Sequence, residues 1–242
     1  MIREDILAYI CPDVHGRDFW ENIIDTYNGE IPVIFLGDYL DPYKEEGVTD
    51  KDAEKTFKKI WDFKEKWGDK VILLLGNHDL SYYDYYFRTC RFSNENAEWY
   101  CNFLKENINK FKISHSIINN EKTIIFSHAG IHPLWLKYNN LEQKFDSEYI
   151  NNIFENNPNL FYQYTYYRGG YKRAGSPIWS DIREYVTLDE EKVPEDVLQI
   201  VGHTQLITDT LTFNNVTCID SRQVFVLKKD NTIEPFNKKE EN

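Results

Sequence analysis

Apolar runs alternate with amphipathic segments over the first third of the chain. The runs are short and uniformly apolar, as strands buried on both faces are. They predict strands at residues 6–11, 31–36 and 71–75. Residues 18–27 repeat apolar side chains at helical spacing. A second helix is predicted to begin after Thr49, an N-cap residue with Asp52 three positions on. This alternation predicts a mostly parallel sheet with right-handed crossovers.

The pattern changes after a further helix, which is predicted at residues 96–109. Residues 112–118 and 122–126 have the pattern of paired strands around Asn119-Asn120, a hairpin turn signal. Later apolar runs predict strands at residues 198–201, 216–219 and 224–228. Asp230-Asn231 would turn a final hairpin, and residues 237–242 are expected to form a frayed tail. Because no break in composition marks a boundary, residues 1–242 are expected to form a single domain.

Composition and charge limit the possible functions. The chain has 242 residues, of which 41% are hydrophobic, enough to build a core for one large domain. Its formal net charge of -12 argues against stable nucleic-acid binding, which needs a basic face, and against a general role at membrane surfaces. The sequence has no apolar stretch of signal-peptide or membrane-spanning pattern, so a cytoplasmic location is expected.

The four cysteines are Cys11, Cys90, Cys101 and Cys218, and they lack the paired spacing of a metal site. Cys11 and Cys218 lie in apolar, strand-like runs. We therefore expect buried free thiols rather than a disulfide framework.

Five short polar motifs follow one another along the chain, most of them directly after an apolar run. They are Asp13-Val14-His15-Gly16, Gly37-Asp38-Tyr39-Leu40-Asp41, Gly76-Asn77-His78-Asp79, His128-Ala129-Gly130 and Gly202-His203-Thr204. A single motif of this kind would be ordinary turn chemistry. In parallel α/β sheets, however, ligands bind at the carboxyl ends of strands, where these motifs fall. Together they supply carboxylates, imidazoles and an amide, the ligand set of a two-metal centre.

The ligand chemistry divides six of these residues between two ions. One ion takes Asp13, His15 and Asp38, and the other takes Asp38, Asn77, His128 and His203. A carboxylate can bridge two cations, which is the role expected of Asp38. Oxygen and nitrogen ligands without thiolate suit Mn, Fe or Zn better than Ca or Mg. Two such ions can activate a water and clamp a phosphoryl group, so we expect hydrolysis of a phosphate ester through a metal-bridging hydroxide.

His78 follows the expected ligand Asn77, and we expect it to act on the substrate instead of binding metal. Its imidazole could be the general acid at the leaving oxygen, or a cation that stabilises the phosphoryl oxygens. An imidazole in either role usually has a carboxylate that orients it. Asp41 is the first candidate for that carboxylate, and Asp79 is the second.

These five motifs resemble those of the calcineurin-like metallophosphoesterases, in particular the phosphoprotein (Ser/Thr) phosphatase branch and its diadenosine tetraphosphatase relatives. That branch reads Asp-x-His-Gly, Gly-Asp-x-x-Asp, Gly-Asn-His-Glu/Asp, His-Ala-Gly and Gly-His-Thr. The segment Ser176-Pro177-Ile178-Trp179-Ser180-Asp181 also resembles one that precedes the last histidine in this branch. The resemblance implies an α/β fold, a four-layer sandwich of two mixed β-sheets flanked by helices. It also implies the ligand assignment given above and the pairing of Asp41 with His78.

The sequence departs from the branch where protein phosphatases hold the phosphate. Pro42-Tyr43 follows Asp41 in place of Arg-Gly, and Leu75 stands where an arginine often precedes Gly-Asn-His. Another basic group must therefore meet the substrate phosphate. The candidates are Arg17, Arg168, Arg173 and Arg183. Any one of them could be an ordinary surface arginine, but arginine's planar fork suits phosphate oxygens, and we expect at least one to bind phosphate.

Two further features have a structural and a functional interpretation. The aromatic run at residues 161–168 is expected to pack a lid or hairpin against the core; the alternative is a stacking surface for a nucleobase. His115 lies in a strand pattern and is expected to be structural. His132 either lines a pocket or, as we favour, makes a local hydrogen bond to its turn.

The sequence thus predicts a metal-dependent hydrolase acting on phosphoester or phosphoanhydride bonds, with two Mn, Fe or Zn ions. Its substrate would be a phosphorylated small molecule, a nucleotide or a phosphoprotein. We favour an activity of the Ser/Thr phosphatase type, with hydrolysis of a diadenosine polyphosphate or another nucleotide as the alternative. A non-catalytic binding module is a third interpretation, and nuclease action a fourth that the net charge disfavours.

Overall fold

The structure, a computed structural model, describes residues 5–24, 27–84, 87–188 and 190–236. The chain divides into two compact units. Unit 1 comprises Met1–Leu73, His78–Phe111 and Arg222–Asn242, and unit 2 comprises Leu74–Asn77 and Lys112–Ser221. Each unit is described by itself below. The tail expected at residues 237–242 lies outside the described residues.

Unit 1 contains most of a six-stranded mixed sheet. In sheet order its strands are β11 (Ile233–Pro235), β10 (Phe225–Lys228), β1 (Ile6–Cys11), β2 (Val33–Phe35), β3 (Val71–Leu74) and β4 (Phe111–Lys112). Strands β1, β2 and β3 run parallel, as the alternating pattern predicts. Strands β10 and β11 join antiparallel, as expected of a hairpin at Asp230-Asn231. All three residues of β2 are buried, which agrees with a strand covered on both faces.

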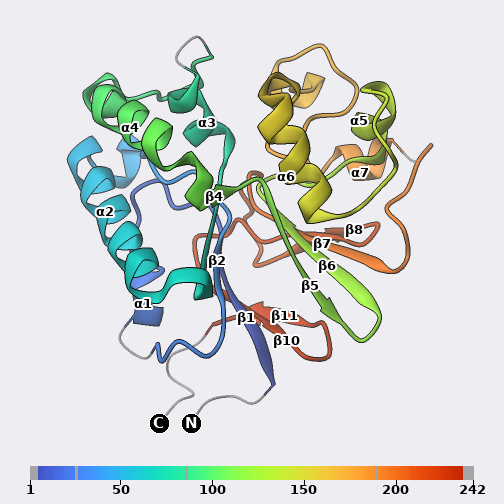
Figure 1. Cartoon of the computed structure of the whole chain (residues 1–242), viewed down its shortest axis with the longest axis horizontal. Coiled ribbons are helices and arrows are strands. Elements are labelled where there is room, and N and C mark those ends of the chain that lie inside the picture. The colour runs from blue at the N-terminus through green and yellow to red at the C-terminus, as the bar shows by residue number, and fades with distance from the viewer. Residues whose placement is uncertain (1–4, 25–26, 85–86, 189, 237–242) are drawn as a thin grey trace. The chain divides into compact units, whose positions relative to one another are not determined.

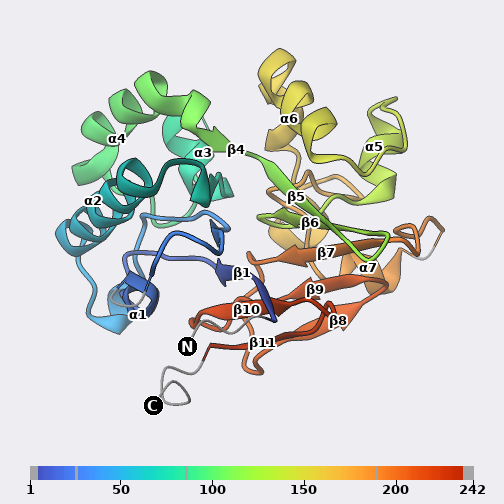
Figure 2. The ribbon, with the colours of Figure 1, turned by 60° about the horizontal axis from the view of Figure 1, so that its bottom comes forward.

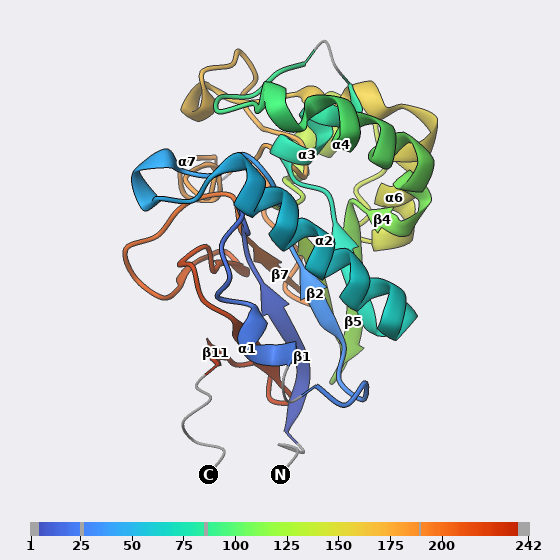
Figure 3. The ribbon, with the colours of Figure 1, turned by 90° about the vertical axis from the view of Figure 1, so that its left-hand side faces the viewer.

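The helices of unit 1 are α1 (Glu21–Ile24), α2 (Asp50–Trp67), α3 (Asn77–Tyr83), whose first residue belongs to unit 2, and α4 (Asn94–Asn107). Helix α2 begins at the predicted capping box, because Thr49 and Asp52 each accept the other's backbone N–H. It lies beside α4 in Figure 1 and in Figure 3. The buried Phe57 of α2 packs edge-on against Tyr100 of α4, with ring centroids 4.9 Å apart.

In the described residues, the helix predicted at residues 18–27 begins only at Glu21. Helix α1 covers Glu21–Ile24, and Tyr27 lies outside it. The indole nitrogen of Trp20 donates a hydrogen bond to the carbonyl oxygen of Arg17 at 3.0 Å, and Glu21 N–H bonds to the carbonyl of Asp18. These contacts form a tight turn over residues that the apolar spacing assigns to a helix.

Unit 2 contains a five-stranded mixed sheet. Its strands, in sheet order, are β5 (Ser114–Asn119), β6 (Lys122–Ser127), β7 (Val197–Val201), β9 (Val216–Cys218) and β8 (Leu211–Phe213). Figure 2 shows them side by side. The predicted β5–β6 hairpin is present, but it turns at Asn120 and Glu121, with φ of 49° and 62°. The predicted turn is one residue too early because Asn119 still pairs with Lys122.

The helices of unit 2 are α5 (Pro133–Tyr138), α6 (Ser147–Asn156) and α7 (Glu184–Thr187). Helix α6 packs against β5, where the Asn151 amide oxygen accepts the backbone N–H groups of Ile113 and Ser114. Two mixed sheets with flanking helices confirm the predicted α/β class. In the described part of the chain, none of the helices is both long and apolar enough to cross a membrane.

The aromatic run differs from its expected packing. It forms two short 3-10 turns, Pro158–Tyr162 and Tyr166–Arg168, and no hairpin. Phe161 is buried, as expected, but Tyr166 is 67% exposed and the nearby Tyr171 is 86% exposed. The second half of the segment therefore offers its rings to solvent.

Candidate functional site

The first motif places two buried side chains just after β1. Asp13 and His15 are each 3% exposed. The Nδ1 atom of His15 lies 2.8 Å from the carbonyl oxygen of Leu40, so it carries the proton and the lone pair lies on Nε2. Burial lowers the pKa of His15 well below its usual range, and the charges of His78 and Arg91 lower it further. A neutral imidazole with a lone pair on Nε2 is the form that binds a metal.

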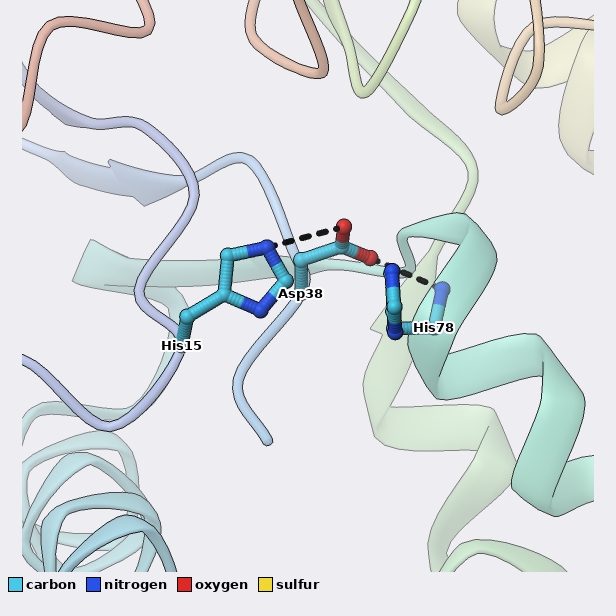
Figure 4. A group of neighbouring side chains, drawn as sticks. All are labelled: His15, Asp38 and His78. Atoms are coloured by element: carbon cyan, nitrogen blue, oxygen red, sulfur yellow. Dashed lines mark hydrogen bonds and ion pairs between the residues drawn. The ribbon is translucent and has the colours of Figure 1, made fainter. Parts of the chain in front are cut away.

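Asp38 stands between two histidines in unit 1 (Figure 4). Its Oδ2 lies 3.5 Å from Nε2 of His15, and its Oδ1 accepts the backbone N–H of His78 at 2.9 Å. Burial raises the pKa of Asp38 well above its usual range, and the nearby carboxylates of Asp13 and Asp79 raise it further. A bound cation would offset this repulsion, so the group around Asp38 suits a metal ion. His15, Asp38 and His78 offer ligand atoms within 4.8 Å of one another.

The loop that carries Asp38 is held by Asp79, a fully buried carboxylate. Asp79 accepts the backbone N–H groups of Asp38 and Tyr39 at 2.7 and 3.1 Å, and the hydroxyl of Tyr100 at 3.1 Å. These bonds fix Asp38 in the left-handed backbone region, at a φ of 53°. Asp79, the second candidate for orienting His78, therefore supports the Asp38 loop.

The carboxylate beside the His78 ring is Asp41. Its Oδ2 lies 2.7 Å from Nδ1 of His78, while its Oδ1 accepts the hydroxyl of Tyr82 and the backbone N–H of Ser93. Burial raises the pKa of Asp41 to about 7, although these hydrogen bonds and the charge of Arg91 oppose the shift. Because Nδ1 faces Asp41, Nε2 is the His78 atom that can reach a substrate.

A further arginine, which the motif analysis missed, completes this group. The Nη2 atom of Arg91 lies 3.4 Å from Nε2 of His15 and 3.4 Å from Nε2 of His78. Its Nε donates to the carbonyl oxygen of Asp41, and its guanidinium stacks on the ring of Tyr43. Arg91 belongs to none of the five motifs and lies 13 residues after His78, so spacing alone could not single it out.

The other expected ligands form a second group in unit 2. Nε2 of His128 lies 2.9 Å from Oδ1 of Asn77 and 3.0 Å from Nδ1 of His203. Asn77 follows β3, His128 follows β6, and His203 lies shortly after β7. Two imidazole nitrogens and an amide oxygen thus converge, and such donors match a transition-metal site. The donor sets of both units therefore fit metal ions.

In unit 2, two of the four expected arginines converge on Asp181, a fully buried carboxylate. Arg168 reaches its Oδ2 at 2.9 Å, and Arg183 contacts both of its oxygens. Arg168 also donates to the Thr204 hydroxyl at 2.7 Å and to the carbonyl of His203 at 3.3 Å. Its bonds therefore hold the loop that carries His203.

The other two arginines are also paired with carboxylates. Arg17 forms a two-pronged contact with Glu46, which Arg222 contacts from a second direction at 2.8 Å. Arg173 pairs with Glu190 at 2.5 Å. Each of the four expected arginines thus has an acidic partner in its own unit.

The remaining histidines lie within unit 2. The Nδ1 atom of His132 accepts the backbone N–H of Leu134 at the start of α5, the local hydrogen bond expected for it. His115 lies in β5, and burial lowers its pKa to about 4. Cys11, Cys101 and Cys218 are buried free thiols, as predicted, whereas the free thiol Cys90 is exposed.

Carboxylate, amide and imidazole groups that follow the strands of two mixed sheets are the side chains expected of a metal-dependent hydrolase. The chain belongs to the calcineurin-like phosphoesterases, whose family model matches residues 7–228. Members depend on a dinuclear metal centre and hydrolyse phosphoesters, so this chain is a metal-dependent phosphoester hydrolase. A comparison with curated proteins returned no match.

Proposed function

We propose that the protein is a phosphatase of the Ser/Thr phosphatase type, which hydrolyses phosphate monoesters with two Mn, Fe or Zn ions. Six residues would hold the ions: Asp13, His15 and Asp38 of unit 1, and Asn77, His128 and His203 of unit 2. The observation that carries the proposal is that Asn77 Oδ1 and His203 Nδ1 both lie within 3.0 Å of His128 Nε2. Family membership over residues 7–228 supports it.

In this proposal, the residues that bind the metal ions differ from those that transfer the proton. When bound, the two ions would supply Lewis acidity and an activated water. His78 would donate a proton from Nε2 to the leaving oxygen, or stabilise the phosphoryl oxygens as a cation. Asp41 would hold the ring in place, which its 2.7 Å contact with Nδ1 supports. Arg17, Arg168, Arg173 and Arg183 remain predicted phosphate contacts.

A second candidate substrate is a dinucleoside polyphosphate. It is favoured by Tyr166 and Tyr171, whose exposed rings could stack on a nucleobase. It also fits Pro42-Tyr43 in place of the arginine that protein phosphatases use after the second motif.

A substrate panel tests the proposal. We expect the protein, supplied with Mn²⁺, to hydrolyse p-nitrophenyl phosphate and a phosphothreonine peptide. Hydrolysis of diadenosine tetraphosphate with little turnover of the peptide would favour the second candidate. If the metal-loaded protein cleaves none of these and no cyclic nucleotide, it is a binding module and the proposal is wrong. The matched control is Asp69→Asn, which removes an exposed carboxylate and should leave the rates unchanged.

A further inference from the structure

Arg91 is placed among the groups that would handle the substrate, although no motif contains it. Its Nη2 lies 3.4 Å from the Nε2 atoms of both His15 and His78. One imidazole belongs to an expected metal ligand and the other to the expected proton donor. A guanidinium can only donate hydrogen bonds. The guanidinium and the two imidazoles thus meet in one place, so a substrate oxygen within reach of His78 would also lie close to Arg91.

The charge of Arg91 is not neutralised in the way that the other candidate arginines are. Within the described residues, its side chain forms hydrogen bonds and a ring contact but no ion pair with a carboxylate. Arg17, Arg168, Arg173 and Arg183, by contrast, each pair with Glu46, Asp181 or Glu190. No carboxylate of the described residues pairs directly with Arg91, although its charge also acts on Asp38, Asp41 and Glu46; its N–H groups can therefore still bind an anion.

Tyr43 and the Asp41 backbone hold this guanidinium in position. Its carbon lies 3.8 Å from the centroid of the Tyr43 ring, a close cation–π contact. Its Nε donates to the carbonyl oxygen of Asp41 at 3.2 Å. Arg91 also has a left-handed backbone, with a φ of 62°, which is uncommon outside glycine and asparagine. Such strained residues concentrate at functional sites, where the surrounding structure maintains them.

The positive charges expected around Arg91 indicate that its ligand is an anion. A cation next to a metal ligand would repel the metal unless an anion lies between the two positive charges. A phosphoryl group meets this requirement, and its oxygens suit arginine's fork of donors. A phosphomonoester carries two negative charges near neutral pH and a diester only one, so the monoester gains more from the guanidinium.

We infer that Arg91, stacked on Tyr43, binds the phosphoryl oxygens of a phosphomonoester and favours monoesters over diesters. It would take the place of the arginine that Pro42-Tyr43 replaces after the second motif. The reaction named in this inference rests on the proposed phosphatase function, but the binding of phosphate to Arg91 can be tested without any reaction.

The test compares Arg91→Ala and Arg91→Lys with Arg88→Ala, a control in the same segment whose guanidinium stacks on Phe92. Calorimetry with inorganic phosphate is measured on each protein, with kcat and KM for p-nitrophenyl phosphate and for bis-p-nitrophenyl phosphate. We expect Arg91→Ala to weaken phosphate binding by about tenfold or more and to lower kcat/KM for the monoester by about thirtyfold, with a smaller loss for the diester. Arg91→Lys should recover part of the loss, and Arg88→Ala should match the wild type.

Bound metal and melting temperature are measured in parallel, and both should be unchanged in Arg91→Ala. Phosphate affinity within twofold of the wild type, equal losses on the two esters, or loss of metal along with activity would overturn the inference. Tyr43→Ala provides a second test, because it keeps the guanidinium and removes the ring on which it stacks. This variant should also bind phosphate more weakly than the wild type. If the wild type hydrolyses neither ester, the proposed function fails, and the phosphate titration still decides the role of Arg91.

Discussion

Four of the expected functional residues share an unusual backbone. His15, Asp38, Asp41 and His203 have φ values of 44°, 53°, 59° and 64°, and Arg91 has 62°. Residues other than glycine seldom adopt this region, although Asn, Asp and His do so more often than the rest. His15 lies in the loop after β1, Asp38 and Asp41 lie in the loop after β2, His203 lies in the loop after β7, and Arg91 lies between α3 and α4. The contacts of Asp79 hold the Asp38 loop. The turns aim the side chains, at some cost in backbone energy.

Two substitutions separate metal binding from proton transfer at this scale. His78→Asn should keep both ions and lose roughly a hundredfold or more in turnover, the scale of a missing general acid. Asp38→Asn should lose metal and activity together, because it removes the carboxylate expected to bridge the ions. Metal content by mass spectrometry and kcat on p-nitrophenyl phosphate check both variants.

The outcome for His78 has a clear alternative, because its ring also lies in a group of side chains that could hold an ion with His15 and Asp38. If His78→Asn releases metal, His78 is a ligand and the assignment of a separate acid is wrong.

At the scale of elements, the sequence predicted the parts of the fold that local rules control. The capping box at Thr49 and Asp52 begins α2, and β1 matches its apolar run. The hairpins also formed where turn residues interrupt alternating strands. Motifs that follow strands were predictable for the same reason, since a buried apolar strand followed by polar residues marks where the chain leaves the sheet.

Tertiary contacts settled what the sequence left open. Arg91 reaches His78 from 13 positions away, and Tyr100 reaches Asp79 from 21. The hydrophobic periodicity of a sequence carries no information on contacts between residues so far apart along the chain. The short strand β8 (Leu211–Phe213) was missed because its residues are only half-buried or exposed and lack an apolar run.

The first residue of α7, Glu184, should make stability depend on pH. Glu184 is fully buried, and its carboxylate accepts the N–H groups of Gly175 and Asp181 and the hydroxyl of Ser180. Burial nevertheless raises its pKa from 4.5 to about 7. The folded state then holds the proton more tightly than the unfolded chain, so this contribution to stability is complete below about pH 4.5 and falls as pH rises to about 7. The shift corresponds to about 3 kcal/mol in the free energy of unfolding.

Urea unfolding of Glu184→Gln between pH 4.5 and 8 tests this contribution. An amide cannot ionise, so the variant should lose stability less steeply than the wild type over this range. Glu195→Gln, which changes an exposed glutamate in the same unit, serves as the control and should keep the wild-type slope. Parallel curves for the wild type and Glu184→Gln would show that Glu184 ionises in the folded protein at its ordinary pKa.

At the scale of the whole molecule, the expected ligands are distributed over both units. Asn77 and His78 are consecutive, yet the boundary between the units falls between them. The family match runs from residue 7 to residue 228 and so includes both units. The net charge of -12 also makes positive groups such as Arg91 valuable, because a phosphorylated substrate must approach a predominantly acidic protein.

A metal titration tests the central claim, metal-dependent phosphoester hydrolysis, most directly. Protein stripped with a chelator is titrated with Mn²⁺, Fe²⁺ or Zn²⁺ while bound ions and the hydrolysis of p-nitrophenyl phosphate are measured together. We predict almost no hydrolysis by the stripped protein, and a rate that rises with added metal and saturates at two ions per chain. Hydrolysis that survives complete removal of metal, or two bound ions without hydrolysis, would contradict the account.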